Sequence, residues 1–159
     1  MKVPLKYVPN KLDDKDKKKQ VKMLKKSKKL YDKKEYYSRE PLKSFNSKPS
    51  GHVQKAKTMY NVKNIIPSKE LAKKTGCSVH SMQQIVKKGQ GAYYSSGSRP
   101  NQTAHSWGIA RLASAITSGN SAIIDFHIID KGCNHKKKAY KLATEAKKKR
   151  LRKSPKVNI

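Results

Sequence analysis

Acidic side chains are scarce in this sequence: its 159 residues include 10 Asp and Glu but 39 Lys and Arg. The formal net charge is +29 and the isoelectric point is about 10.2. A compact monomer with this charge repels itself, so we expect an anionic partner in the working state. Nucleic acid, an anionic membrane surface and an acidic protein assembly are the three classes of partner that fit.

Carboxylates are scarcest in the middle of the chain, where only Glu70, Asp125 and Asp130 lie between residues 41 and 134. Metal-dependent nucleases and phosphoesterases gather several carboxylates around their ions, which three scattered ones cannot do. The five histidines show neither HxxxH nor HExxH spacing, and no GxSxG motif marks a nucleophilic serine. We therefore expect a protein that is not an enzyme and that uses no cofactor or metal.

Long apolar runs are absent as well. No segment approaches the roughly 20 apolar residues that a membrane-spanning helix needs, so we expect a protein that is not transmembrane. Hydrophobic residues make up 35% of the sequence and the mean hydropathy is −0.92, values that favour one small domain.

Only two cysteines occur, Cys77 and Cys133, and they lack CxxC spacing. Two isolated cysteines do not make the dense disulfide framework of small secreted domains. We expect both thiols to be reduced, which favours an intracellular compartment.

Lysine is abundant everywhere except in Gly89–Ser114, which instead holds Gly, Ser, Asn, a Tyr pair and the only Trp. Lys-rich segments lie on both sides of a more apolar middle, and the sequence has no internal repeats. We expect an α+β fold, mainly α, in which a small compact middle with a short β element is flanked by Lys-rich helical arms. The expected divisions are a basic N-terminal arm with one helix capped by Asp13 or Asp14 (1–50), a compact core (51–133), and a basic C-terminal helix with an irregular tail (134–159).

Capping residues and hydrophobic spacing place the elements of the expected core. Ser68 and Ser78 precede two helical patterns, and Gly76 lies at the corner between them. Gly89 ends the second pattern, and Thr103 precedes a third. The run SAIIDFHII is rich in β-branched and aromatic residues, which favours a strand. The expected elements are a helical hairpin over 68–89, a signature loop over 89–103, a helix over 104–118 and a strand over 121–129.

Two short helices around a glycine corner are also the pattern of a DNA-reading helix-turn-helix. A plain helical hairpin explains the same residues, and the sequence leaves both interpretations open. In the DNA-reading case the exposed face of the second helix contacts nucleic acid, where glutamine side chains are able to read adenine edges. The candidate nucleic-acid contacts are His80, Gln83, Gln84, Lys87 and Lys88.

The stretch around the signature loop is the candidate binding site, because a loop this rich in Gly, Ser and Asn often carries function. Its aromatic rings, hydroxyls, amides and guanidinium groups can clamp a phosphate group. They can equally bond to one another and form a rigid loop that positions an interface, and the sequence does not decide between the two. The candidate binding residues are Tyr93, Tyr94, Ser96, Arg99, Asn101, Gln102, Trp107 and Arg111.

The run GAYYSSGSRPNQTAHSWGIARLAS, followed by a segment that contains Asp125, resembles the signature of an uncharacterised family of small basic proteins. These proteins are encoded by nucleocytoplasmic large DNA viruses, among them chlorovirus, mimivirus and marseillevirus relatives. The resemblance covers about Leu71–Asp130, and the segments LYDKKEYYSRE and KKTGCS are similar too. It implies a viral product and brings no catalytic residues with it.

Together, the resemblance and the charge predict a non-enzymatic structural protein of the virion, made in the host cell cytoplasm. We expect a minor capsid or core component that bridges other virion proteins and anionic surfaces, which include DNA and the inner membrane. The alternative is a DNA-binding, genome-packaging protein that uses the helix-turn-helix-like segment and the Lys-rich arms.

Overall fold

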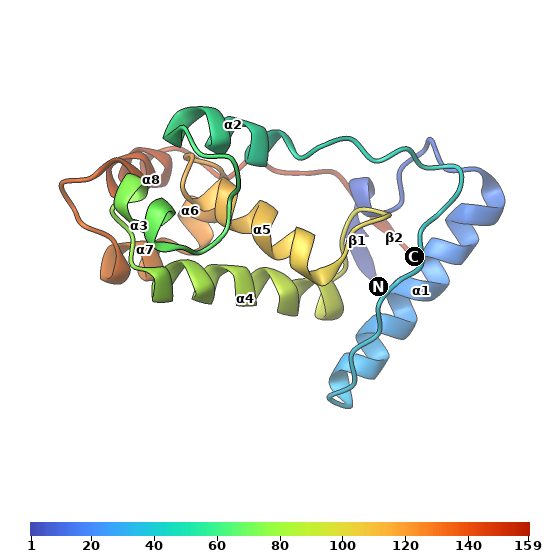
Figure 1. Ribbon diagram of the computed structural model, residues 1–159. Coiled ribbons are helices and arrows are strands. Elements are labelled where there is room, and N and C mark those ends of the chain that lie inside the picture. Colours follow the sequence, from blue (N-terminus) through green and yellow to red (C-terminus); the bar gives the residue numbers. More distant parts are fainter. The chain divides into compact units, whose positions relative to one another are not determined.

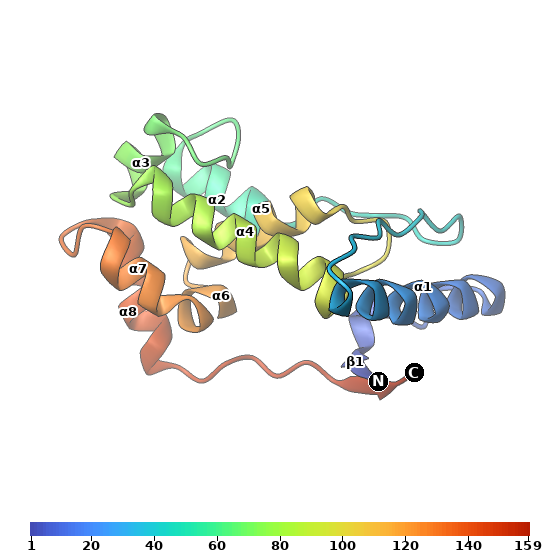
Figure 2. The same cartoon turned by 90° about the horizontal axis from the view of Figure 1, so that it is seen from below.

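The computed structural model describes all of residues 1–159 (Figures 1 and 2). It is mostly helical with one two-stranded antiparallel sheet, which confirms the α+β, mainly α, fold class. The helices are α1 (Asp14–Asp32), α2 (Gly51–Tyr60), α3 (Lys69–Thr75), α4 (Val79–Ser95), α5 (Ala104–Ala115), α6 (Asn120–Ile124), α7 (Phe126–Gly132) and α8 (Lys138–Lys148). The strands are β1 (Lys2–Pro4) and β2 (Lys156–Asn158), and a short 3-10 helix spans Leu5–Tyr7.

The chain folds into two compact units, each assembled from separate stretches of sequence. Unit 1 consists of residues 1–48, 90–107 and 153–159, and unit 2 of residues 49–89 and 108–152. Residues 90–107 thus group with the first 48 residues rather than with the rest of the expected 51–133 core.

Four helices begin at the capping residues that the sequence predicts. In each case the side-chain oxygen of the cap accepts a hydrogen bond from the backbone N–H three residues on, which satisfies a donor that the first helical turn leaves unpaired. The pairs are Asp13 with Asp16 (2.7 Å), Ser68 with Leu71 (3.2 Å), Ser78 with Ser81 (3.1 Å) and Thr103 with Ser106 (3.0 Å).

The corner between α3 and α4 is also as predicted. Gly76 has a φ of 82°, in the left-handed region that favours glycine, and its N–H donates to the carbonyl of Ala72 at 2.8 Å. The structure therefore confirms two helices on either side of a glycine corner, a geometry that a helical hairpin and a helix-turn-helix share.

The prediction that Gly89 ends the second helix was wrong. Helix α4 continues to Ser95, so the expected loop over 89–103 is reduced to residues 96–103. Gly89 instead allows a close approach of α4 to α5, because a Cβ atom on it would lie 2.6 Å from the Cα of Gly108. Helix α5 ends at Ala115, three residues before the expected Ser118.

We predict that Gly89→Ala lowers the free energy of unfolding by about 1–2 kcal/mol, because the added methyl group meets backbone that cannot move aside cheaply. Gly91→Ala is the matched control, since it lies one half-turn further along α4 and its Cβ would find only the Tyr31 hydroxyl, at 3.7 Å. That change should stabilise by about 0.5–1 kcal/mol through helix propensity alone. Urea denaturation followed by circular dichroism measures both, and equal stabilisation by the two changes would contradict the close crossing.

The strand expected over 121–129 is not present; this segment forms α6 and α7 instead. Its apolar side chains serve helical packing, with Ala122, Ile128 and Ile129 buried in the core of unit 2. Helices α6, α7 and α8 pack on one another (Figure 2). The strand propensity of the isoleucines is overridden by this packing, as often happens with short apolar runs.

The tail expected to be irregular contains β2, which pairs antiparallel with β1 in the register Val3 to Val157 (Figure 1). The N–H of Ile159 donates to the carbonyl of Met1 at 2.8 Å, so the pairing reaches the last residue. Val3 is buried in the core of unit 1, which holds the small sheet in place.

A buried arginine that sequence inspection did not single out joins the segments of unit 1. The guanidinium group of Arg39 donates to the hydroxyl of Ser27 (2.9 Å), the carbonyl of Tyr93 (2.8 Å) and the hydroxyl of Ser98 (2.8 Å). It also stacks on the Tyr93 ring at 3.8 Å. Because Arg39 has only neutral partners, burial lowers its pKa. Residues 90–107 are thereby fixed to the N-terminal segment.

Candidate nucleic-acid interface

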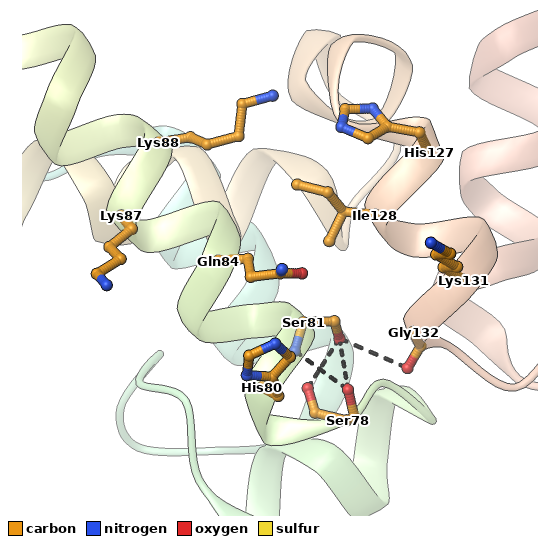
Figure 3. Close-up of a pocket in the computed structure, with 10 residues that line it drawn as sticks. All are labelled: Ser78, His80, Ser81, Gln84, Lys87, Lys88, His127, Ile128, Lys131 and Gly132. Atoms are coloured by element: carbon orange, nitrogen blue, oxygen red, sulfur yellow. Dashed lines mark hydrogen bonds between the residues drawn. The ribbon is translucent and has the colours of Figure 1, made fainter.

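Unit 2 contains an open groove of about 820 Å³ between α4 and α7 (Figure 3). Figure 3 shows the side chains of Gln84 and Lys88 extending from α4 towards α7, with Ile128 between the two helices. The groove is lined by Ser78, His80, Ser81, Gln84, Lys87, Lys88, His127, Ile128, Lys131 and Gly132.

The lining is cationic and contains no carboxylate. Three lysines and two histidines contribute to it from the two helices, and the remaining polar groups are hydroxyls, an amide and backbone. The nearest exposed acid along α7, Asp130, pairs with His135 through a 3.3 Å contact. A groove of one charge sign raises the local concentration of oppositely charged ligands.

Beneath this surface lies Asp125, which is completely buried and binds two cations. Its carboxylate accepts from Arg111 Nε at 2.7 Å and Nη2 at 2.8 Å, a bidentate pair, and contacts Lys88 Nζ at 3.0 Å. Burial acts to raise the pKa of Asp125, but the hydrogen bonds and charges of Arg111 and Lys88 outweigh it and hold the pKa below its ordinary value. Asp125 therefore orients Arg111 and Lys88, and the three side chains together carry a net charge of about +1.

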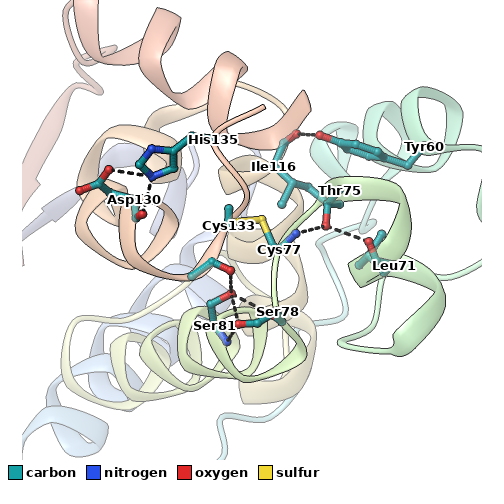
Figure 4. The surroundings of a disulfide bond; sticks show 11 residues. Tyr60, Leu71, Thr75, Cys77, Ser78, Ser81, Ile116, Asp130, Cys133 and His135 are labelled. Atoms are coloured by element: carbon teal, nitrogen blue, oxygen red, sulfur yellow. Dashed lines mark hydrogen bonds and ion pairs between the residues drawn. A yellow bond between two sulfur atoms is a disulfide. The ribbon is translucent and has the colours of Figure 1, made fainter. Parts of the chain in front are cut away.

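At one end of the groove a disulfide joins the two walls, which corrects the expectation of two reduced thiols. Cys77 immediately precedes the cap of α4, Cys133 follows α7, and the two sulfur atoms are bonded (Figure 4). The backbone on either side is paired too: Ser78 N–H donates to the carbonyl of Gly132, and Asn134 N–H to that of Gly76, both at 2.8 Å. Residues 56 apart in sequence cannot be seen as partners without the fold.

The structure brings together four of the five predicted nucleic-acid contacts. His80, Gln84, Lys87 and Lys88 line the groove, whereas Gln83 is exposed on α4 outside it. Two further residues of the groove, His127 and Lys131, were not among the predicted contacts: His127 lies in the segment interpreted as a strand, and Lys131 follows that segment. Both lie on the opposite wall of the groove, together with Ile128 and Gly132.

The residues predicted for the signature loop serve mainly to hold unit 1 together. Tyr93 is fully buried, and its hydroxyl accepts from the Arg39 N–H at 2.9 Å. Asn101 accepts from the N–H of Leu42 at 2.6 Å and donates to the carbonyl of Phe45 at 2.8 Å. A buried ring and an amide with these internal partners are not free to clamp a ligand.

The other candidate binding residues from the signature loop and its surroundings lie in three different environments. Trp107 packs edge-on against Tyr7 with ring centroids 5.8 Å apart, and Gln102 accepts from the Ser106 hydroxyl at 2.8 Å. Arg111 belongs to unit 2, where it binds Asp125. The exposed members are Ser96 and Arg99, and Tyr94 is half-buried. These eight residues therefore do not form one site.

No group of three or more His, Cys, Asp or Glu residues is arranged to hold a metal ion. None of the helices combines the length and the apolar composition required to cross a bilayer.

The fold and the groove define a small, basic, mainly α-helical protein with a cationic cleft between two helices. The chain belongs to DUF5824, a family of unknown function, whose sequence profile matches residues 4–134 and so includes every residue of the groove. Comparison with curated proteins and with solved structures gave no match.

Proposed function

We propose that the protein is a non-enzymatic, nucleic-acid-binding structural component of the virion of a large DNA virus. The observation that carries the proposal is the groove between α4 and α7, whose lining is cationic on both walls and free of carboxylates. Phosphate groups of a nucleic-acid backbone match this lining in charge, and lysine suits such sequence-independent contacts.

The charge balance of the whole chain supports the same partner. Only three of the 39 Lys and Arg side chains pair with a carboxylate, namely Lys19, Lys88 and Arg111. The other cations form no ion pair with a carboxylate of the chain, so binding to a polyanion relieves their mutual repulsion and releases condensed counterions. The resemblance of Leu71–Asp130 to basic proteins of large DNA viruses supports the viral setting.

We predict that Lys87→Ala combined with Lys131→Ala weakens binding to a random DNA duplex of about 20 base pairs by roughly 10–100-fold at about 0.1 M salt. The slope of log K against log salt concentration should fall by about two, because each phosphate contact contributes about one. Fluorescence anisotropy of labelled duplex over a salt series measures both quantities. Lys88 is kept, because its ammonium group belongs to the Asp125 ion pair.

The matched control is Lys73→Ala combined with Lys74→Ala, which removes the same charge from exposed positions on α3 in the same unit. It should weaken duplex binding only by the amount expected from lowering the net charge of the protein by two. Equal effects of the two double variants would show that the groove is not the site. Absence of binding by the wild-type protein to both duplex and single-stranded DNA at about 0.1 M salt would overturn the function itself.

A second groove favours the other candidate, a minor capsid component that docks on protein neighbours. It measures about 600 Å³, lies in unit 1 between α1, strand β2 and the residues that follow β1, and has an apolar floor with a rim of lysines. An acidic protein segment with apolar side chains matches this surface. The floor is formed by Leu5, Val8, Val21, Val157 and Ile159, and the rim by Lys17, Lys18, Lys22 and Lys25.

The two candidates are separated by gently disrupting virions and assaying shell and genome-containing core by immunoblot. Recovery with the core supports the nucleic-acid function. Recovery with empty shells, together with duplex binding that is lost at about 0.1 M salt, supports the capsid function instead.

A further inference from the structure

The most exposed large hydrophobic side chain of the protein is Tyr36, which is 70% exposed. It follows α1 after a short turn in which Lys34 adopts a φ of 62°. Its ring is therefore accessible to a ligand from solvent.

Tyr36 is the outer end of a row of tyrosines in unit 1. Its ring centroid lies 5.1 Å from that of Tyr94 and 6.1 Å from that of Tyr31. Tyr94 in turn meets the buried Tyr93 edge-on, with centroids 5.1 Å apart. The row therefore runs from the core to the surface as continuous aromatic contact.

Hydrogen bonds at its inner end hold this row in place. Arg39 N–H donates to the Tyr93 hydroxyl at 2.9 Å, and the Ser27 hydroxyl donates to the carbonyl of Tyr94 at 2.9 Å. Arg39 also donates to the Ser27 hydroxyl. The inner rings are fixed before any ligand arrives, which reduces the entropy lost on binding.

The ionisable surroundings of Tyr36 are mixed but mainly basic. Asp32 and Glu35 are exposed in the adjoining turn, next to the exposed lysines 28, 29, 33 and 34. A further lysine, Lys26, lies over the neighbouring Tyr37 ring at 4.4 Å. Aromatic rings beside lysines are the combination that binds single-stranded nucleic acid, where bases stack on the rings and ammonium groups follow the backbone.

We propose that Tyr36, supported by Tyr31 and Tyr94, is a stacking platform for the unpaired bases of single-stranded nucleic acid. This inference rests on the proposed nucleic-acid function and deepens it, because it names the strand state that unit 1 recognises. Bases inside a duplex are already stacked on one another and cannot lie on an external ring. The platform thus distinguishes single strands from duplex, whereas the lysines of the unit 2 groove contact the backbone charge that both share.

The test compares a labelled oligothymidine of about 20 nucleotides with a duplex of equal length by fluorescence anisotropy. Tyr36→Ala should weaken binding of the single strand at least about five-fold, and duplex affinity should stay within about two-fold. Tyr36→Phe, which keeps the ring and loses the hydroxyl, should bind the single strand as the wild type does. Ile66→Ala, a truncation of another exposed apolar side chain, is the control for loss of surface area.

The outcomes separate this inference from the function on which it rests. Unchanged single-strand affinity in Tyr36→Ala, or equal losses for single strand and duplex, would overturn the platform while leaving the groove of unit 2 untouched. Loss of duplex binding in the Lys87 and Lys131 double variant, with the Tyr36 effect on single strands retained, would support both. If the wild-type protein binds neither form, the function and the platform fail together.

Discussion

Asp125→Asn is expected to lower the free energy of unfolding by about 3 kcal/mol, a large part of the stability of a small protein. The carboxylate is completely buried and is the only acid in contact with Arg111 and Lys88. An asparagine of the same shape fills the space but leaves the Arg111 guanidinium, whose side chain is 19% exposed, without its counter-charge. Thermal and urea unfolding followed by circular dichroism measure the loss.

Asp130→Asn is the matched control, because this carboxylate lies in the same segment and also contacts a basic side chain, with its Oδ1 3.3 Å from His135 Nε2. Its side chain is 52% exposed and its partner His135 is exposed as well, so the change should cost less than about 1 kcal/mol. A loss for Asp125→Asn no larger than that of the control would show that the buried pair does not stabilise the fold.

The pH dependence gives a second readout of the same carboxylate. Because the pKa of Asp125 is lowered in the folded state, its stabilising contribution is fully present above the pKa of an unfolded Asp, about 3.9. The contribution is lost as the pH falls through the lowered pKa of the folded protein. The stability difference between wild type and Asp125→Asn should therefore be constant near neutral pH and should shrink in strongly acidic solution.

The second large effect is expected from removal of the disulfide. Replacing Cys77 and Cys133 together by Ala should lower the free energy of unfolding by about 4 kcal/mol, because the bond closes a loop of 56 residues in the unfolded chain. Replacing both residues avoids leaving a reactive thiol. The loss should appear in urea unfolding under non-reducing conditions.

Reductant is the control for the disulfide. A thiol reagent such as dithiothreitol should lower the stability of the wild-type protein towards that of the double variant and should leave the variant unchanged. Thiol titration of the denatured protein without reductant should find no free thiol. Two titratable thiols per chain would contradict the bond between Cys77 and Cys133.

The bond also bears on the proposed function, since it ties the start of α4 to the end of α7 and these helices are the walls of the groove. We expect the double variant, assayed at a temperature at which it remains folded, to bind duplex DNA more weakly than the wild type does.

Helix starts were predictable from the sequence because the chemistry of a cap is local. Asp13, Ser68, Ser78 and Thr103 each satisfy a backbone donor three residues away, so no knowledge of the fold is needed. The role of Gly89, in contrast, is not local. It depends on Gly108, which lies on another helix, so the rule that glycine ends helices led to the wrong boundary.

The difference between local contacts and contacts between distant segments also explains how much of the groove was predictable from the sequence. The α4 wall follows from helical spacing, which correctly placed His80, Gln84, Lys87 and Lys88 on the exposed side of α4. The α7 wall did not follow, because SAIIDFHII has the composition of a strand, whereas the segment is helical and packs against α8, a contact that local sequence does not reveal. Pairing of Cys77 with Cys133 likewise joins residues that are 56 apart in sequence.

The construction of unit 1 from residues 1–48, 90–107 and 153–159 has a consequence for synthesis on the ribosome. At a translation rate of roughly 5–20 residues per second, Ser98 is made about 3–12 s after its partner Arg39. Strand β1 waits longer still for its partner β2, which is translated after all of unit 2. Residues 1–48, which carry 17 of the 39 Lys and Arg residues, thus meet cellular polyanions and chaperones while their partner segments 90–107 and 153–159 are still missing.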